Sequence, residues 1–275
     1  MSLQLDARQR AMLQEMGIRV FWPEATPVDL SMQGQVEETE AIAVEVAPVE
    51  VRPAARSPEP VAVRAERPVA LPTPLRPDAP PRQRMPGIEA MQWEALGEAV
   101  ATCRACGLCE GRHNTVFGVG DLHPDWLIVG EAPGENEDRE GEPFVGQAGK
   151  LLDNMLAALS LSRHQRVYIA NVLKCRPPGN RNPEPQEIAQ CEPFLRRQVE
   201  LLQPKIILAM GRFAVQTLLQ SNEPIGRLRG RVHDYNGVPV VVTYHPAYLL
   251  RNLPDKAKAW ADLCLAQGVL RGSST

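Results

Sequence analysis

The sequence predicts an α/β fold, namely a three-layer α/β/α sandwich around a central, mainly parallel sheet of about four strands. Two observations carry this prediction. Four short apolar runs are typical of buried strands. Segments of helical periodicity separate these runs, and strands that alternate with helices are typical of a parallel sheet with helices on both faces.

The elements follow one another in a regular order. The expected strands are residues 126–129, 167–173, 205–210 and 238–244. The expected helices are residues 91–102, 149–161, 185–202, 212–219 and 256–270. Right-handed crossovers would bring the carboxyl ends of the strands to one edge, where ligands bind in open α/β sheets. We therefore expect the polar residues that follow three of these strands to converge.

The N-terminal part of the chain differs from this pattern. Residues 5–22 carry apolar side chains at roughly helical spacing, so residues 1–30 are expected to form a short amphipathic helix. Residues 31–88 contain 11 of the 26 prolines and no aromatic residue, and they lack the apolar bulk that offsets the entropy of ordering. We expect a disordered Pro-rich linker there, followed by one folded domain over residues 89–275.

Composition excludes several classes of protein. A net charge of −3 argues against a broadly basic nucleic-acid binder, although local basic clusters can still follow phosphates. No apolar run approaches the roughly 20 residues of a membrane span, and the N-terminus lacks the apolar segment of a secretory signal. The sequence thus predicts a cytoplasmic protein without a membrane segment, where clustered cysteines indicate metal or redox chemistry rather than disulfides.

Three strand ends carry the polar residues of interest. The first expected strand runs into Gly-Glu-Ala-Pro-Gly at 130–134, and an acidic loop then leads to Pro-Phe-Val-Gly at 143–146. Asn171 lies at the end of the second strand, and His245 directly follows the last one. Glycines, a carboxylate and one aromatic after a buried strand have the layout of a ligand site, although an ordinary loop would look the same in isolation.

Five of the six cysteines are spaced as metal ligands: Cys103, Cys106, Cys109, Cys175 and Cys191. Four thiolates suit either Zn²⁺ or a [4Fe–4S] cluster, and the spacing leaves both open, together with a redox or fortuitous Cys-x-x-Cys. A metal group with ligands from such distant segments would hold these segments together, which is a structural role. Cys264 lies in an apolar helical pattern and is expected to be buried.

Residues 101–270 resemble the iron–sulfur, type 4 uracil-DNA glycosylases. The resemblance rests on the two loop motifs at 130–134 and 143–146, on Asn171 four residues before Cys175, on the cysteine spacing, on KCRPPGNR at 174–181 and on HPAYLLR at 245–251. It implies a monofunctional DNA repair enzyme that hydrolyses the N-glycosidic bond of deoxyuridine in single- or double-stranded DNA, releasing uracil and leaving an abasic site. It also implies a structural [4Fe–4S] cluster held by Cys103, Cys106, Cys175 and Cys191, with Cys109 as a spare or substitute.

The resemblance also implies roles in the pocket. Phe144 would offer a face on which the flipped pyrimidine stacks. Asn171 would bond uracil N3–H and O4, where cytosine offers the reverse pattern. His245 would hydrogen-bond uracil O2 as negative charge builds there, and Glu131 would orient the water or stabilise the cationic sugar.

Neighbouring residues complete the expected site. Backbone groups around Ala132 and Pro133, next to Glu131, would contact the base. Gly134 replaces the bulky aromatic with which some other uracil glycosylases exclude thymine, and Glu137 is our candidate for crowding the C5 position instead.

Residues 245–251 are expected to contact DNA. Leu249 would fill the gap left by the flipped base while Arg251 reaches a phosphate. The alternative is that Leu249 and Leu250 begin the last helix and belong to the core. Further candidate phosphate contacts are Arg176, Arg181 and Arg229.

The expected partner is uracil-containing DNA, bound by a monomer without a catalytic metal. A helix on a long linker could also dock a replication or repair protein, although a poorly ordered tail explains the same residues. Two other interpretations stay open: a non-catalytic DNA-binding or polymerase-associated module with the same fold, and a zinc-stabilised enzyme of unrelated chemistry. The presence of Glu131, Asn171 and His245 together disfavours the first.

Overall fold

The computed structural model describes residues 85–272 and Glu15. Apart from Glu15, the expected N-terminal helix and most of the expected linker therefore lie outside the described residues. The linker boundary at residue 88 is corrected, because Ile88 is 2 % exposed and packs in the core beside α2 (Trp93–Thr102). The folded part of the chain thus includes Ile88, in a short 3₁₀ turn, η1 (Ile88–Ala90).

A single six-stranded sheet forms the centre of the fold, in the order β1-β3-β2-β4-β6-β5. Its four inner strands are mutually parallel: β2 (Trp126–Gly130), β3 (Val167–Asn171), β4 (Ile206–Met210) and β6 (Val238–Thr243). Every residue of β2, β3 and β4 is buried, as expected of parallel strands that are covered on both faces. The mixed α/β sandwich predicted from the sequence is confirmed.

The predicted number of about four strands is corrected to six. Both additional strands are antiparallel edge strands, β1 (Val119–Gly120) and β5 (Val232–Tyr235). Two residues are too few to give β1 a periodic signal, and β5 alternates between exposed and half-buried residues. The turn from β5 to β6 uses Asn236 and Gly237, both with positive φ, so this Asn-Gly pair was an available hairpin signal.

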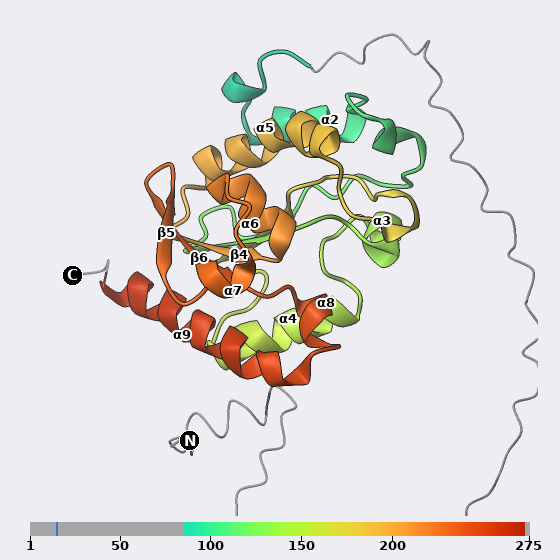
Figure 1. Cartoon of the computed structure of the whole chain (residues 1–275). Helices are drawn as coiled ribbons and strands as arrows, with labels where there is room; N and C mark the ends of the chain where they lie inside the picture. Colours follow the sequence, from blue (N-terminus) through green and yellow to red (C-terminus); the bar gives the residue numbers. More distant parts are fainter. Residues whose placement is uncertain (1–14, 16–84, 273–275) are drawn as a thin grey trace, which may run out of the picture. The chain divides into compact units, whose positions relative to one another are not determined.

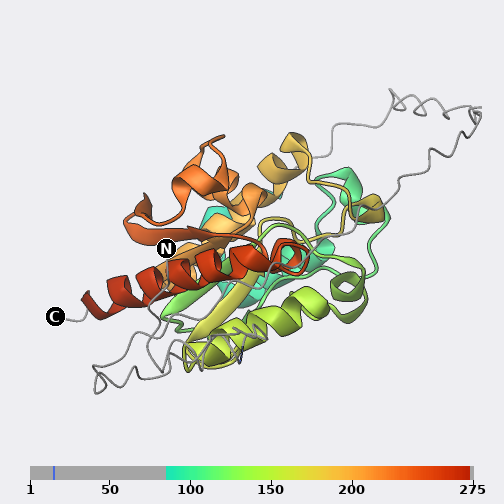
Figure 2. The same ribbon diagram turned by 60° about the horizontal axis from the view of Figure 1, so that its bottom comes forward.

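Helices cover both faces of the sheet. On one face, α4 (Gln147–Ala158) and α9 (Lys256–Gly272) pack against the side chains of Trp126 and Ile128. On the other face, α5 (Pro185–Leu202), α6 (Arg212–Leu219) and α7 (Ile225–Leu228) pack against Leu127 and Val129. Figures 1 and 2 show α4 and α9 together on one side of the sheet, and Figure 1 shows α2 and α5 on the other side.

The remaining elements are short and lie in the connections: η2 (Gly107–Glu110), α3 (Glu135–Glu140), η3 (Pro178–Asn180), α8 (Pro246–Leu249) and η4 (Leu253–Asp255). Cys264 was expected to be buried in the last helix. This prediction is wrong, since Cys264 is exposed on α9. Among the described residues no helix is long and apolar enough to cross a membrane.

Candidate functional site

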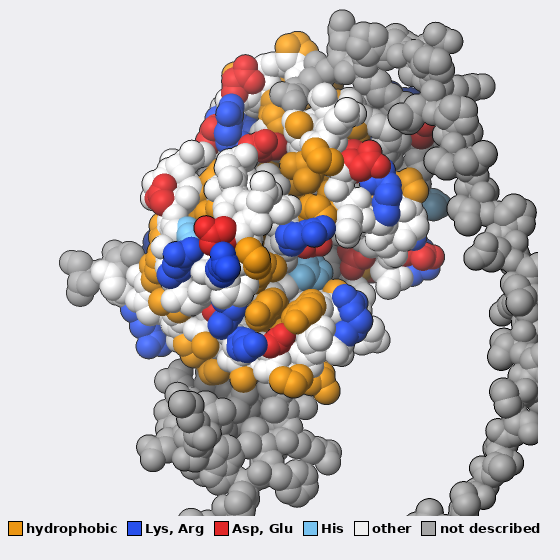
Figure 3. Space-filling model, viewed as in Figure 1, with side chains coloured by type: hydrophobic (Ala, Val, Ile, Leu, Met, Phe, Trp, Pro, Cys, Tyr) orange, Lys and Arg blue, Asp and Glu red, His pale blue; other side chains and the backbone are white. Residues whose placement is uncertain are grey.

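A cleft of about 960 Å³ opens at the carboxyl edge of the sheet, where β2, β4 and β6 end. Its lining includes the predicted site residues Glu131, Ala132, Pro133, His245 and Arg251. The convergence expected from the strand order is therefore observed. Basic side chains are scattered over the face viewed in Figure 3 and alternate with acidic ones, in keeping with the near-neutral charge of the folded region.

Asn171 and Phe144 lie beside this cleft, and their side chains meet over Gly130. A Cβ atom on Gly130 would collide with Asn171 Oδ1 and would lie 2.6 Å from the Phe144 ring, so only glycine fits. Asn171 is 2 % exposed, and its Oδ1 atom accepts no hydrogen bond within the described protein. A buried acceptor without a donor costs roughly 1–3 kcal/mol, so a donor from a ligand or from water would be favourable at this position.

Phe144 is held in an uncommon backbone conformation, with φ at 57°. Arg163 stabilises it by donating from Nη1 to the carbonyl oxygen of Pro143 (2.9 Å) and from Nη2 to that of Phe144 (2.8 Å). The Phe144 ring stacks against His245, with ring centroids 5.3 Å apart and planes inclined by 26°. The sequence analysis did not identify Arg163, because no local sequence pattern links it to a loop 19 residues earlier.

His245 is held as a neutral ring. Its Nδ1 atom accepts a hydrogen bond from the backbone N–H of Ala247 (3.1 Å), at the start of α8. Burial lowers the pKa of His245 to about 4; the charge of Arg251 acts in the same direction, and that of Glu137 opposes it. Near pH 7 the ring proton therefore resides on Nε2, which can donate a hydrogen bond.

Glu131 directs its carboxylate at the beginning of α6. Its Oε1 atom accepts a hydrogen bond from the backbone N–H of Phe213 (3.2 Å). Gly211 makes room for it: a Cβ atom there would lie 2.5 Å from Oε1, and its φ of 92° also favours glycine. Burial raises the pKa of Glu131, while the backbone N–H groups of Phe213 and Arg212 and the Arg212 charge lower it.

Glu137 ties the two loop motifs together. Its Oε2 atom accepts from the N–H of Gly134 (3.0 Å), and its Oε1 atom accepts from the N–H groups of Val145 (3.0 Å) and Gly146 (3.2 Å). This bridge between the loops was not foreseen from the sequence. The exclusion of thymine by Glu137 stays a prediction.

The five clustered cysteines line a second, smaller cavity together with Arg112 and Lys174. All five thiols are free of disulfides. Arg112 Nη1 donates to Cys175 Sγ (3.1 Å), and the backbone N–H of Lys174 donates to Cys191 Sγ (3.3 Å). Burial raises the pKa of Cys175 to about 11 and that of Cys191 to about 12. Such buried thiols become thiolates only beside compensating positive charge.

The four predicted ligands and Cys109 thus lie together, with two cationic side chains beside them. This donor set fits a thiolate-bound metal group, because N–H groups aimed at sulfur are typical of such sites. No group of three or more His, Cys, Asp or Glu side chains in the described part of the chain is arranged around a single-ion position.

One predicted DNA contact is corrected. Leu249 is fully buried and packs in the core with α4 and α9, whereas Leu250 is 41 % exposed. Leu249 therefore cannot enter DNA from this position. The neighbouring Arg251 is exposed on the lining of the cleft, as expected of a DNA contact.

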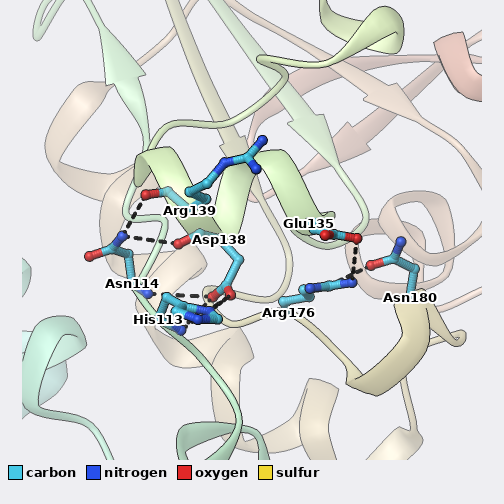
Figure 4. Close-up of polar contacts among 7 residues, drawn as sticks. All are labelled: His113, Asn114, Glu135, Asp138, Arg139, Arg176 and Asn180. Atoms are coloured by element: carbon cyan, nitrogen blue, oxygen red, sulfur yellow. Dashed lines mark hydrogen bonds and ion pairs between the residues drawn. The ribbon is translucent and has the colours of Figure 1, made fainter.

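The other predicted arginines already have protein partners. Arg176 donates to Asn180 Oδ1 (2.7 Å) and pairs with Glu135 (3.2 Å), as Figure 4 shows. Arg181 pairs with the buried Glu187, and Arg229 with the buried Asp262. Arg212 is a cleft residue that the sequence analysis missed, and its guanidinium lies 4.5 Å from the centre of the Phe213 ring.

Comparisons with known proteins indicate the family of this chain. A family model described as the uracil DNA glycosylase superfamily matches residues 117–264. The chain is 45 % identical over 159 residues to a Type-4 uracil-DNA glycosylase of Archaeoglobus fulgidus, covering 55 % of this chain and 79 % of the relative. A Type-4 uracil-DNA glycosylase of Thermotoga maritima is 45 % identical over 167 residues, covering 60 % and 86 % respectively. For one of Saccharolobus solfataricus the identity is 44 % over 170 residues, covering 58 % and 78 %.

Proposed function

The chain belongs to the uracil DNA glycosylase superfamily, and on this premise we propose that it removes uracil from DNA. It hydrolyses the N-glycosidic bond of deoxyuridine, releases uracil and leaves an abasic site. The observation that carries the proposal is the buried Asn171 Oδ1 atom, which has no hydrogen-bond partner in the described protein and lies with the Phe144 ring over Gly130. Phe144 stacks on His245, which lines a cleft wide enough to receive a flipped nucleotide.

Asn171 recognises the Watson–Crick edge of uracil. Its Oδ1 atom accepts from N3–H, and its Nδ2 group donates to O4. Cytosine presents an acceptor at N3 and a donor at N4, so the same amide would face two mismatched groups in an enclosed site. Such a site discriminates strongly, because unpaired buried polar groups are costly. Phe144 supports the base through its ring, and backbone groups around Ala132 and Pro133 border it.

His245 stabilises the leaving group. As the glycosidic bond lengthens, negative charge develops on uracil O2 and positive charge on the sugar. The neutral ring donates from Nε2 to O2, and its orientation is fixed because Nδ1 is bonded to Ala247. A neutral donor suits this role. The low pKa of His245 means that the ring is neutral near pH 7, and a neutral imidazole N–H is too weak an acid to lose its proton to the departing uracil anion.

Glu131 acts on the sugar side. Its carboxylate lines the cleft and is fixed by the first N–H groups of α6. From this position it orients the attacking water or stabilises the oxocarbenium-like sugar. Because burial raises its pKa, activity should fall as pH decreases through the pKa of Glu131 in the folded protein.

DNA lies across the cleft. We assign the wedge to Leu250, the exposed apolar side chain next to Arg251, in place of Leu249. Arg251 and Arg212 contact phosphates, because both are exposed on the cleft lining. Arg176 is the further predicted phosphate contact, and a phosphate would compete there with Glu135.

The second cavity holds a [4Fe–4S] cluster with a structural role, bound by Cys103, Cys106, Cys175 and Cys191. When bound, the cluster would join three segments of the chain and would add no catalytic step. Arg112 and Lys174 offset part of the negative charge of the thiolates. Cys109 lines the same cavity and is a spare ligand. Cysteines that form no disulfide also suit the cytoplasm, our proposed compartment, and the enzyme acts as a monomer.

The test uses single-stranded and duplex oligonucleotides that carry one uracil, with cytosine or thymine at the same position as controls. After incubation, abasic sites are cleaved with alkali and the products are sized. Cleavage that depends on uracil is the expected result. Iron analysis and the visible spectrum of the same preparation report the cluster. A protein with full iron content and no uracil-dependent cleavage would contradict the enzymatic function, and a colourless zinc protein would contradict the cofactor.

A further inference from the structure

Residues 113 and 114, which follow the first three cysteines, form hydrogen bonds with helix α3 around Asp138, and we call these contacts the clasp. The carboxylate of Asp138, 1 % exposed, accepts hydrogen bonds from the backbone N–H groups of His113 (3.0 Å) and Asn114 (3.4 Å). His113 Nδ1 also lies 2.8 Å from Asp138 Oδ2. The Asn114 side chain donates to the carbonyl oxygens of Asp138 and Arg139, at 3.0 and 2.9 Å. Figure 4 shows these contacts together on one side of the helix.

This clasp determines where α3 lies. The helix has only six residues, and a helix this short is not stable on its own. A buried carboxylate is tolerated only where hydrogen bonds satisfy it. Asp138 meets this condition through backbone groups of a segment 24 residues earlier in the sequence, so the contact is tertiary rather than part of the helix.

The next step leads from α3 to the uracil pocket. Glu137 precedes Asp138 in α3, and its carboxylate bonds the N–H groups of Gly134, Val145 and Gly146. These groups belong to the two loops that carry Glu131 and Phe144. A shift of α3 would therefore break three hydrogen bonds that hold the pocket loops together.

Arg112 connects the same segment with the cysteine cavity. Arg112 directly precedes His113, and its side chain donates to Cys175 Sγ (3.1 Å) and to the carbonyl oxygen of Ala101 (2.8 Å). Residues 112–114 thus contact a predicted cluster ligand at one end and α3 at the other. An unbroken series of bonds connects Cys175 with the pocket loops.

We propose that Asp138 is a positioning residue that fastens the uracil-binding loops to the cysteine-bearing segment. It touches neither the base nor the proposed cluster, and it acts through Glu137. The inference rests on the proposed function. It explains how thiols that take no part in the reaction can influence the geometry of the pocket.

Three variants test this role: Asp138→Ala removes the clasp, Asp138→Asn retains the shape and one acceptor oxygen, and Asp121→Ala is the control. Asp121 also accepts two backbone N–H groups, from His123 and Arg166, but it lies at the opposite edge of the sheet, before β2. Each variant is purified with its cluster. Iron content, the visible spectrum, hydrogen exchange of residues 131–149 and the affinity for free uracil are measured.

We expect Asp138→Ala to keep its iron while residues 131–149 exchange at least about tenfold faster and the affinity for uracil falls at least about tenfold. Asp138→Asn should lie between this variant and the wild type, and Asp121→Ala should match the wild type in both measurements. Wild-type exchange and uracil affinity in Asp138→Ala would overturn the proposal, as would equal losses in Asp121→Ala. If Asp138→Ala does not fold, the test passes to Asp138→Asn. Hydrogen exchange and uracil affinity equal to those of the wild type in Asp138→Asn would overturn the proposal, and intermediate values would support it. Failure of the proposed function appears separately, as a wild-type protein that binds no uracil.

Discussion

The uracil pocket and the cysteine cavity share the segment from Asn171 to Cys175, yet they are built in different ways. In the pocket, Glu131 and His245 are fixed by backbone N–H groups at the ends of strands that the sheet already aligns. The cavity collects thiols from residues 103–109 after α2, from the loop after β3 and from α5. The side chains of the pocket are therefore fixed by backbone groups of the fold, whereas the thiols of the cavity form a donor set whose segments a bound metal group would hold together.

The largest effect is expected at the cavity. Cys175→Ala removes a buried, proposed cluster ligand, so we expect loss of most of the iron and a reduced yield of folded protein. A loss of about 3 kcal/mol would lower Tm by roughly 6–12 °C in a domain of this size. Calorimetry and iron analysis check this result. Cys264→Ala is the matched control, because Cys264 is exposed on α9, outside the cavity. Similar stability of the two variants would contradict the proposal that the cavity, unlike the pocket, contributes mainly to the stability of the fold.

The pocket should respond in activity rather than in stability. Asn171→Ala is expected to reduce kcat/KM on uracil-containing DNA by about 10²–10³-fold, comparable to losing a donor to developing charge. The iron content should remain unchanged, since Asn171 carries no thiol. Removing the unsatisfied Oδ1 atom should also leave the folded state no less stable. The exposed Asn154 on α4 provides the control, and equal kinetics in Asn171→Ala and Asn154→Ala would show that the base lies elsewhere.

Much of the pocket could be predicted because its residues occupy strand ends. An apolar run fixes where a strand stops, and parallel order then brings Glu131 and His245 to one edge. The expected bounds of α5 and α6 also agree with the structure. Strands β1 and β5 were missed because one is very short and the other is an exposed edge strand.

Contacts between distant segments could not be predicted in this way. Arg163 donates a hydrogen bond to Phe144, 19 residues earlier in the sequence, and Asp138 accepts one from His113, 25 residues earlier. Leu249 and Leu250 are adjacent, and a one-residue difference in helix phase decides which of them is buried. Cys264 shows the same problem, because its burial depends on the exact face that α9 turns to the sheet.

A smaller loss is expected from moving a carboxylate without removing it. In Gly211→Ala the new Cβ atom would lie 2.5 Å from Glu131 Oε1, so the carboxylate must shift. We expect kcat to fall about 10-fold to 100-fold, because a displaced carboxylate keeps part of the roughly 10²–10⁴-fold contribution of a positioned acid or base, with KM little changed. Gly230→Ala is the matched control, because it imposes a similar positive φ, 76°, with no atom near the new Cβ. Equal steady-state kinetics in the two variants would mean that backbone strain, not Glu131, explains the loss.

The smallest effect on catalysis is expected at the DNA surface, and adjacent leucines test it. Leu250→Ala should lower kcat/KM on duplex DNA several-fold, because an exposed apolar side chain no longer fills the gap left by the flipped base. Its effect on single-stranded DNA should be weaker, since no stacked duplex has to be opened. Leu249→Ala should instead destabilise the fold by about 2–5 kcal/mol, the usual cost of truncating a buried leucine. Denaturant unfolding and kinetics on both substrates separate the two outcomes. A duplex defect in folded Leu249→Ala, with wild-type kinetics in Leu250→Ala, would return the wedge to Leu249 and require the buried segment to open when DNA binds.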